Sequence, residues 1–508
     1  MIKNSMLQKL LFILVMVCFA GLLIINILDF SIFLKSLWQE FLNIYNKKRF
    51  LLLFLLLLSL ISLLIICLRK FKPSKSLKSD NSLAFILILF FVSLIIKLIF
   101  IFAVNTKQFS DFQLFYWVTA DIAKKTPKYL SESYFSLWAY QAGFPALMSP
   151  IMKIFGINII PLLITNCVFM SVKNIIIYLL LRMFLTEKTS RIVSCAYAFF
   201  PFVLNLSSIY TNQHLASMLL YLGVYILIYN KKLTMKRSIL AGILFSLSNV
   251  CRPEAILIIA SLLGYGIITT VKLNLTYLKV RLKEVFLPIG CTVLTYFICF
   301  SVISQLFVTS GLNPHGLSNN FPLYKFVVGL NHSTSGSYSQ EDADYLFHNP
   351  AFIDNPDLRD EEAMRLIKER ISAGPFKLGT LMINKARIMW TTNPSWYRSF
   401  RDIDFNSTFQ IFDITIPLGF VFHFFTAIDF VFLILIFFFG IICMYSAFKS
   451  DENHLIQILL TLFIMVTFFA YCLVEVQLRY CYLSLPAMFI IAAIGLEKHI
   501  NKSQLSTP

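Results

Sequence analysis

The chain has 508 residues, of which 58% are hydrophobic and only 14% are charged, and its net charge is +18. Together with a mean hydropathy of +0.75, this composition excludes a soluble globular domain and indicates a polytopic membrane protein. The excess of Lys and Arg follows from their placement on one side of a membrane and does not indicate nucleic-acid binding.

Apolar runs predict transmembrane helices along most of the chain. A helix needs about 17–25 apolar residues to cross the hydrocarbon core of a bilayer. Eight runs are that long, at 10–34, 50–68, 84–104, 158–184, 285–307, 427–447, 454–472 and 479–496. Four shorter or interrupted runs lie at 192–208, 212–229, 237–250 and 254–271. We therefore expect an all-α polytopic fold with about twelve spans. The first run lacks a small-residue cleavage site, which favours a retained anchor over a signal peptide.

Clusters of Lys and Arg predict the orientation in the membrane. They follow the second, fourth, sixth and eighth predicted spans, at 69–78, 182–191, 231–237 and 272–283. Cytoplasmic loops of membrane proteins carry such clusters. We therefore expect a protein of the plasma membrane whose two termini both lie in the cytoplasm. The basic residues at 47–49 do not follow this rule, and the first hairpin is therefore less well defined.

Four parts follow from this pattern. The external segments contain helical signals: Asn355 followed by Pro356 predicts a helix start, and Gly374 with Pro375 predicts its end. A second external helix is expected over 376–390, and an interfacial helix over 112–124. The parts are an N-terminal hairpin with a basic linker (1–82), a transmembrane core (83–308) with a first external loop (105–143), an external helical subdomain (309–412) and C-terminal transmembrane helices (413–508).

Ionisable residues gather at the external ends of predicted spans, namely Asp111, Arg252, Glu254, Glu475 and Arg479. Burying such a group in the bilayer costs about 2.5–3.5 kcal/mol, so their convergence favours a site at the outer leaflet. Arginine can bind a phosphate group through two parallel hydrogen bonds.

Each of these residues also has a structural interpretation. Arginine at a helix end often extends to lipid headgroups, and Asp111 could cap a helix that starts at Phe112. His214 could serve catalysis or bind a metal, but a single histidine at an interface is more often an ordinary hydrogen-bonding residue. Trp117 could belong to an interfacial aromatic belt or stack against a sugar ring.

No zincin, zinc-ribbon, P-loop or dinucleotide-binding motif occurs in the chain. The energy for any chemistry must then come from a substrate that is already activated. No cofactor is indicated with certainty, and a divalent metal stays open.

Five stretches resemble the GT-C superfamily of integral-membrane glycosyltransferases, and most of all its family 39-like branch of protein mannosyltransferases and aminoarabinose transferases. They lie at 110–120, 140–156, 200–213, 241–254 and 475–486, and an external stretch at 385–390 is similar as well. Their order and sidedness match the family pattern over about 84–496. Two departures stand out: Phe112 follows Asp111 where many members have a second acid, and Asn212 lies where a Thr-Glu pair is common.

The resemblance implies a transfer reaction with named roles. A sugar would move from a polyprenyl-phosphate-linked donor to an extracytoplasmic acceptor, with inversion and with Asp111 as the base. The residues implied in substrate and phosphate binding are Arg252, Arg479, Tyr480, Glu475 and Glu254. Among them, Glu254 would orient Arg252, and Glu475 with Tyr480 would orient Arg479. Weaker expectations for acceptor or sugar contacts fall on Tyr116, Trp117, Tyr140 and His214.

Two other classes of protein remain open on the sequence. A transporter or lipid flippase would also have many spans, although transporters usually show two halves with matching broken helices. A non-catalytic scaffold for envelope assembly could use the same fold, because a fold does not by itself establish an activity.

Overall fold

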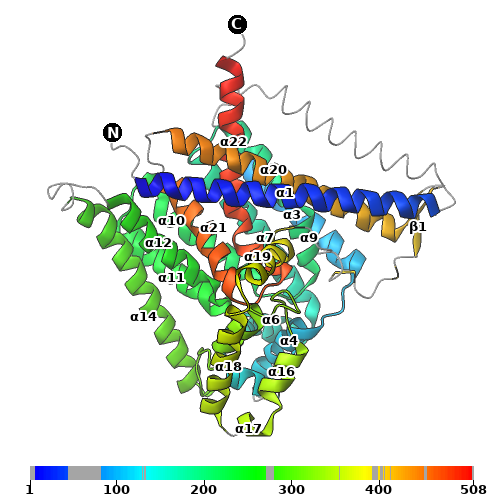
Figure 1. The fold of residues 1–508 in the computed structure, drawn as a ribbon, viewed down its shortest axis with the longest axis vertical. Helices are drawn as coiled ribbons and strands as arrows, with labels where there is room; N and C mark the ends of the chain where they lie inside the picture. Colours follow the sequence, from blue (N-terminus) through cyan, green and yellow to red (C-terminus); the bar gives the residue numbers. More distant parts are fainter. Residues whose placement is uncertain are drawn as a thin grey trace.

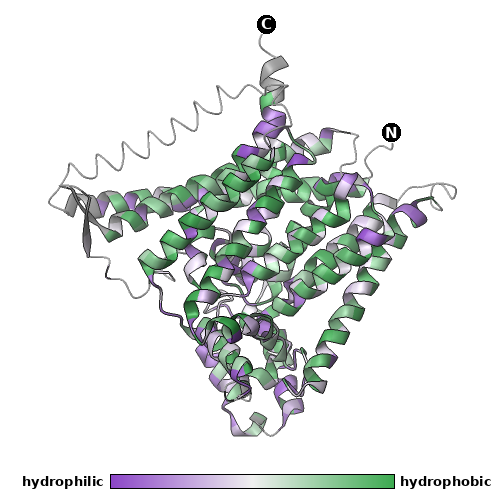
Figure 2. Ribbon diagram, turned by 180° about the vertical axis from the view of Figure 1, so that it is seen from behind, coloured by the Kyte–Doolittle hydropathy of each residue, from purple (hydrophilic) through white to green (hydrophobic). Residues whose placement is uncertain are grey.

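The computed structural model is a bundle of long apolar helices with a smaller group of helices at one end (Figure 1). The hydrophobic residues dominate the long helices, and hydrophilic residues gather over the smaller group at the lower end (Figure 2). The structure describes residues 6–43, 82–126, 128, 130, 133–270, 280–353, 355–391, 399–400, 404, 407–411, 414–450 and 455–505. The expected second span at 50–68 and nearly all of the basic linker lie outside these residues.

The all-α membrane class expected from composition is confirmed. Within the described residues, six helices are long and apolar enough to cross a membrane, or seven if one bent pair is counted as a span. The total of about twelve spans stays a prediction. The six are α1 (Met6–Asn43), α3 (Ser82–Val104), α7 (Ile159–Arg182), α14 (Leu287–Thr309, continuous with the π-helical turn η6, Leu282–Phe286), α20 (Leu418–Lys449) and α21 (Leu455–Leu473).

Further helices complete the membrane part. The bent pair joins α8 (Glu187–Ala198) to α9 (Pro201–Asn205) and η3 (Leu206–Ser208) at 44°. The bend follows from Pro201, which cannot donate the hydrogen bond that would continue α8 and instead starts the next helix. The others are α6 (Gly143–Phe155), α10 (Gln213–Ile228), η4 (Tyr229–Lys231), α11 (Met235–Cys251), η5 (Pro253–Ala255), α12 (Ile256–Thr270), η8 (Leu478–Leu483) and α22 (Leu485–Leu505).

Close contact between α20 and α22 depends on a glycine. The two helices pack along each other, and α20 also packs along α1 (Figure 1). At Gly495, a Cβ atom would collide with the backbone carbonyl of Phe439 on the facing helix. The small residue therefore sets how near the two backbones can come, as is common between membrane helices.

We expect Gly495→Ala to destabilise the protein, because the added methyl group forces α20 and α22 apart. Overpacking of this kind costs about 1–3 kcal/mol. The measurement is the midpoint of thermal loss of the monodisperse peak in detergent. Gly290→Ala is the matched control, since Gly290 in α14 has no neighbouring atom within 4 Å of an added Cβ. An equal loss in both variants would contradict the packing argument.

The external segment folds into helices as the sequence predicted. Its helices are α15 (Leu323–Gly329), α16 (Gln340–Phe347), α17 (Pro350–Ile353), α18 (Pro356–Ile371) and α19 (Pro375–Trp390). The Asn355 side chain accepts a hydrogen bond from the Leu358 N–H at 3.2 Å, and Gly374 has a φ of +96°. Asn355 therefore caps the start of α18 as expected, and Gly374 lies just beyond the end of α18 at Ile371, at the N-cap position of α19.

A β-hairpin and a set of short helices complete the described residues. The strands β1 (Thr408–Ile411) and β2 (Ile414–Pro417) pair antiparallel, which the all-α expectation did not include. The first external loop forms α4 (Ser110–Lys124), α5 (Ser133–Leu137) and η2 (Ala139–Ala142).

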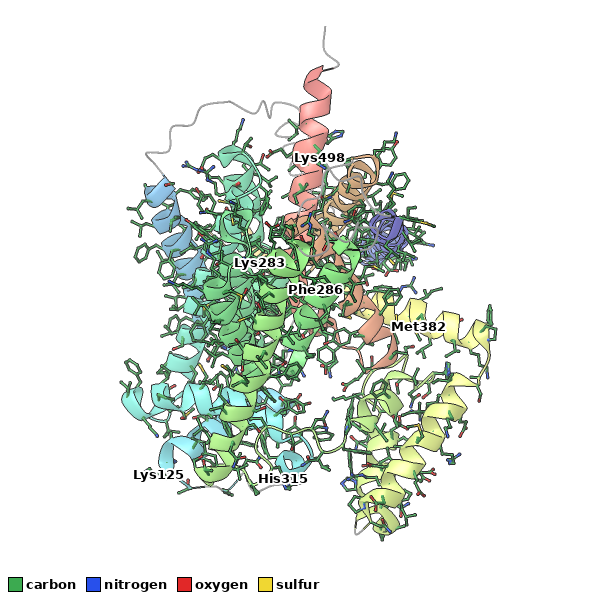
Figure 3. The ribbon with its side chains drawn as sticks, turned by 90° about the vertical axis from the view of Figure 1, so that its left-hand side faces the viewer. Lys125, Lys283, Phe286, His315, Met382 and Lys498 are labelled. Atoms are coloured by element: carbon green, nitrogen blue, oxygen red, sulfur yellow. The ribbon has the colours of Figure 1, made fainter. Side chains whose placement is uncertain are left out.

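The two ends of the bundle carry different residues. Lys283 and Lys498 lie toward one end, and Lys125 and His315 lie at the opposite end (Figure 3). The first pair falls in or beside segments predicted to be cytoplasmic, and the second pair falls in segments predicted to be external. Which of the two ends faces the cytoplasm stays a prediction.

Candidate functional site

Predicted site residues from three separate parts of the chain come together at one end of the bundle, and Lys325 joins them from a fourth. Asp111 lies in the first turn of α4, and Arg252 lies in the break between α11 and η5. Lys325 comes from α15, and the segment that runs from Glu475 into η8 follows α21.

Asp111 pairs with Arg479 and does not cap its helix. α4 begins at Ser110, its N-cap position is Phe109, and that cap has no side-chain hydrogen bond. Instead, the Asp111 Oδ2 atom lies 2.9 Å from the Arg479 Nη2 atom. The capping interpretation is therefore wrong. A carboxylate in the first turn is still favoured by the positive end of the helix dipole.

Arg479 is held by a ring and by an amide. Its side chain is 8% exposed, its guanidinium carbon lies 4.6 Å from the centroid of the Phe112 ring, and its Nε atom donates to the Gln477 side chain at 3.0 Å. Phe112 thus supplies a cation–π contact at the position where many family members have a second acid. Contact with lipid headgroups does not describe this buried arginine.

Arg252 is placed by the proline that follows it. The residue before a proline avoids the helical region, and Arg252 accordingly has φ −156° and ψ 124° and ends α11. Its side chain is 11% exposed and forms an ion pair with Glu254. It also donates to the Asn212 Oδ1 atom at 3.3 Å and lies 5.0 Å from the centroid of the Tyr480 ring. The arrangement agrees with an orienting role for Glu254.

Glu475 is the buried centre of a small network. Its side chain is 3% exposed and forms an ion pair with Lys325. Its Oε1 atom accepts from the Gln477 amide at 2.8 Å and from the Tyr480 hydroxyl at 3.4 Å. Glu475 is therefore linked to Arg479 through the Gln477 side chain, which the expected orienting role of Glu475 did not include.

Mutual attraction keeps the Glu475–Lys325 pair ionised. Burial by itself raises the pKa of Glu475, but Lys325, Gln477 and Arg479 outweigh it and the net shift is downward. Burial by itself lowers the pKa of Lys325, but Glu475 outweighs it and the pKa rises well above its usual value. Both groups thus carry their charges at neutral pH.

Two tyrosines of the first external loop lie within electrostatic reach of this network. Burial raises the pKa of Tyr140, while nearby Lys325 and Arg252 act in the opposite direction. Burial and then Asp111 raise the pKa of Tyr134. The expected position of Tyr140 near the site is therefore consistent with the structure, and Tyr134 joins it.

The remaining weak expectations lie farther from the network. Tyr116 packs against an apolar cluster that includes Phe115 and Phe144, and Trp117 is half-buried. His214 is fully buried; its Nδ1 atom lies 2.8 Å from the Tyr482 hydroxyl and its Nε2 atom 2.9 Å from the Leu206 carbonyl oxygen. His214 is therefore buried against Tyr482 of η8, and a direct contact with a sugar or an acceptor does not fit its position.

Lys385 of α19 holds the chain that leads into the network. Its side chain is buried, and its Nζ atom donates to the carbonyl oxygens of Gly329 at 2.6 Å, Cys472 at 2.8 Å and Val474 at 2.9 Å. Burial lowers the pKa of Lys385 to about 8, against the influence of Cys472 and Glu475. One side chain therefore joins α15, α19 and the end of α21 directly before Glu475.

We expect Lys385→Met to lower thermal stability strongly, because three carbonyl groups lose their donor at once. An unsatisfied buried polar group costs about 1–3 kcal/mol, so the sum is about 3 kcal/mol or more. Lys377→Met, an exposed change on the same helix, should leave the melting midpoint in detergent unchanged. A similar midpoint for both variants would show that the three hydrogen bonds do not hold the loop.

Sequence reasoning missed Lys325, Gln477 and Tyr134. Gln477 lies between the two charged residues of the 475–479 motif, so its position was a usable signal. Lys325 and Tyr134 carry no such signal, since each lies among unremarkable residues of an external segment.

The site has as many negative charges as positive ones. Arg479 pairs with Asp111, Arg252 with Glu254 and Lys325 with Glu475. Among the residues that the structure describes, no group of three or more His, Cys, Asp or Glu side chains could hold a metal ion. A bound divalent metal stays open, and no set of ligands for it was found among the described residues.

Comparison with known proteins gives one family match. Residues 142–302 match the family described as dolichyl-phosphate-mannose-protein mannosyltransferase, and this region includes Arg252 and Glu254. The match confirms the resemblance to GT-C glycosyltransferases that the motifs predicted. No curated protein matches the chain.

Solved structures of an oligosaccharyltransferase from Archaeoglobus fulgidus are also similar. The crystal structure with a tethered acceptor peptide has 13% sequence identity and a TM-score of 0.47, and covers 84% of this chain and 51% of that chain. The apo form has 15% identity and a TM-score of 0.48, with 84% and 52% covered. The complex with an inhibitory peptide and a dolichol-phosphate has 15% identity and a TM-score of 0.42, with the same coverage. The chain thus spans about half the length of these structures.

Proposed function

We propose that this membrane glycosyltransferase of the GT-C type transfers a monosaccharide from a polyprenyl-phosphate-linked donor to a hydroxyl group of an acceptor outside the plasma membrane. The acceptor would be a glycan, lipid or protein of the cell envelope. The observation that carries the proposal is the Asp111–Arg479 ion pair, with Arg252 close to the same Tyr480 ring as Arg479.

The donor phosphate would bind between the two arginines. Both guanidinium groups face the ring of Tyr480, with Arg252 at 5.0 Å and Arg479 at 5.7 Å from its centroid. A phosphate oxygen can take the place of Asp111 on Arg479, because a guanidinium binds phosphate and carboxylate groups in the same geometry. Binding of the donor would then release the Asp111 carboxylate at the moment when a base is needed.

The transfer itself follows from this exchange. Asp111 takes the proton of the acceptor hydroxyl, and the acceptor oxygen forms a bond to the anomeric carbon. The bond between that carbon and the phosphate oxygen breaks, and its electron pair leaves with the polyprenyl phosphate. Arg252 and Arg479 stabilise the charge that develops on the leaving group. Attack from the face opposite to the leaving group inverts the anomeric carbon.

The charge balance favours a donor with one phosphate. The resting site is neutral, because each of its three cations has its own carboxylate. A sugar phosphodiester adds one negative charge to this neutral set, and the proton that Asp111 takes from the acceptor leaves that total unchanged. A diphosphate would bring a second negative charge that no group of this network offsets.

The other residues of the network would hold the arginines and form the acceptor side. Glu254 and Asn212 fix Arg252, and Gln477 fixes Arg479 on behalf of Glu475. Lys325 brings α15, and with it the external helices, to the edge of the site. The acceptor would therefore approach between these helices and the first external loop.

Transfer by the purified protein tests the proposal directly. The protein is reconstituted in liposomes and supplied with polyprenyl-phosphate monosaccharides on one side, and the products are identified by mass spectrometry. Mass analysis of envelope glycans and glycoproteins from cells with and without the protein then identifies the sugar and the acceptor. Movement of the lipid-linked sugar across the bilayer without transfer would instead favour a flippase.

A further inference from the structure

One face of α19 carries two large apolar side chains that the rest of the protein leaves exposed. Phe376 is 87% exposed and Ile383 is 56% exposed. Together with Thr380 and Arg387 they follow each other at intervals of four, three and four residues, which places them on one face of the helix. The opposite face is buried and includes Lys385. α19 therefore buries one face against the protein and exposes large apolar side chains on the other face.

The uncovered face points toward the membrane part of the protein. Arg387, on this face, forms an ion pair with Asp29 of α1 at 3.1 Å, and Asn26 of α1 donates to the Trp390 carbonyl oxygen at 3.3 Å. Beside Asp29, α1 exposes Ile27 and Leu28, which are 48% and 51% exposed. The exposed face of α19 is thus continuous with a surface that faces lipid.

α19 meets α1 in the second half of that helix, at Asn26 and Asp29. Figure 3 shows α19, with Met382, in an arm that projects sideways from the bundle above the other external helices.

We propose that the exposed face of α19 lies on the outer leaflet of the bilayer, with Phe376 and Ile383 in contact with lipid at the headgroup–acyl boundary. Helices of this kind bind in the plane of the interface and place basic residues at the headgroups. Lys377, next to Phe376, and Arg387 supply such charges here. The contact does not depend on the transfer reaction.

One consequence concerns the site. The buried face of the same helix carries Lys385, which holds the carbonyl groups of Cys472 and Val474. The surface of the bilayer would therefore set the height of α19, and α19 would set the position of the segment that carries Glu475.

Photocrosslinking tests the contact without any assay of activity. A photoreactive benzoylphenylalanine replaces Phe376 in one variant of the full chain and Ile383 in another, and each is reconstituted in nanodiscs of phosphatidylglycerol and phosphatidylethanolamine. After illumination, mass spectrometry identifies lipid adducts on the labelled peptide. Phe102 of α3, which is 59% exposed on a membrane helix, is the positive control. Tyr345 and Leu358 of α16 and α18, 42% and 45% exposed, are the matched negative controls.

We expect lipid adducts at positions 376 and 383 at a yield close to that at position 102, and no more than background at positions 345 and 358. Adduct yields at 376 and 383 that match position 345 would overturn the proposal. All five positions are exposed, so each variant is expected to fold, and a monodisperse peak in detergent verifies this before reconstitution.

Discussion

Asp111→Asn is expected to lower sugar transfer by about 10²–10⁴-fold, the usual contribution of a general base. Asparagine has the size of aspartate and can still accept the hydrogen bond from Arg479, which lies 2.9 Å away, but it cannot take a proton from the acceptor. Expression, folding and binding of the lipid donor should therefore be retained. The measurement is the initial rate of transfer in proteoliposomes, together with donor binding to the same preparation.

The control for this substitution is Asp344→Asn. Asp344 is an exposed carboxylate of α16 that contacts His348 and Gln340, and its loss should leave the rate unchanged. Normal transfer by Asp111→Asn would remove Asp111 from the role of base. Loss of both donor binding and transfer would instead indicate that the aspartate shapes the site.

Arg479→Gln is expected to reduce kcat/KM for the lipid donor by about 3 kcal/mol or more, which is roughly 150-fold. A hydrogen bond to a charged group contributes about 1.5–3 kcal/mol, and a guanidinium can make two such bonds to a phosphate; each 1.36 kcal/mol is a factor of ten. The side chain of Arg479 is 8% exposed and lies over Phe112, so glutamine replaces neither its charge nor its ring contact. We expect both a higher KM for the donor and a lower kcat, with the KM for the acceptor unchanged.

Arg365→Gln is the matched control. Arg365 on α18 forms ion pairs with Glu362 and Glu369, but its side chain is 58% exposed, and exposed pairs contribute about 0–1 kcal/mol. Its substitution should leave the donor kinetics unchanged. A rise in the acceptor KM alone for Arg479→Gln would place this arginine on the acceptor side and contradict the phosphate assignment.

Much of the architecture could be predicted because it depends on local properties of the chain. Apolar runs predicted the long helices, and cap residues such as Asn355 and Gly374 predicted the bounds of an external helix. Proline explained the two breaks that matter, at Pro201 and Pro253. The location of charged residues at the outer ends of spans followed from the same pattern, since a charge inside the hydrocarbon core is costly.

The contacts within the site could not be predicted in the same way. Asp111 and Arg479 are separated by 368 positions, and nothing local shows which of the arginines a given carboxylate will meet. His214 shows the same limit. Its sequence context suggested a position at an interface, but packing around Tyr482 buries both of its ring nitrogens. Lys325 reaches the network from a position that looked unremarkable, and Lys385 opened the stretch 385–390 that resembled the family without showing which carbonyl groups it would meet.

By itself, therefore, the sequence determined that this chain is a helical membrane protein, where its long apolar helices lie, that charged residues gather at helix ends and that Asp111 is a candidate base. Only the tertiary structure decided that Asp111 pairs with Arg479, that Phe112 serves as the ring beneath that arginine and that Lys325 completes a neutral set of three ion pairs. The physical reason is that helix formation and membrane insertion depend on properties summed over neighbouring residues, whereas an ion pair depends on the positions of two atoms brought together by the packing of the whole bundle.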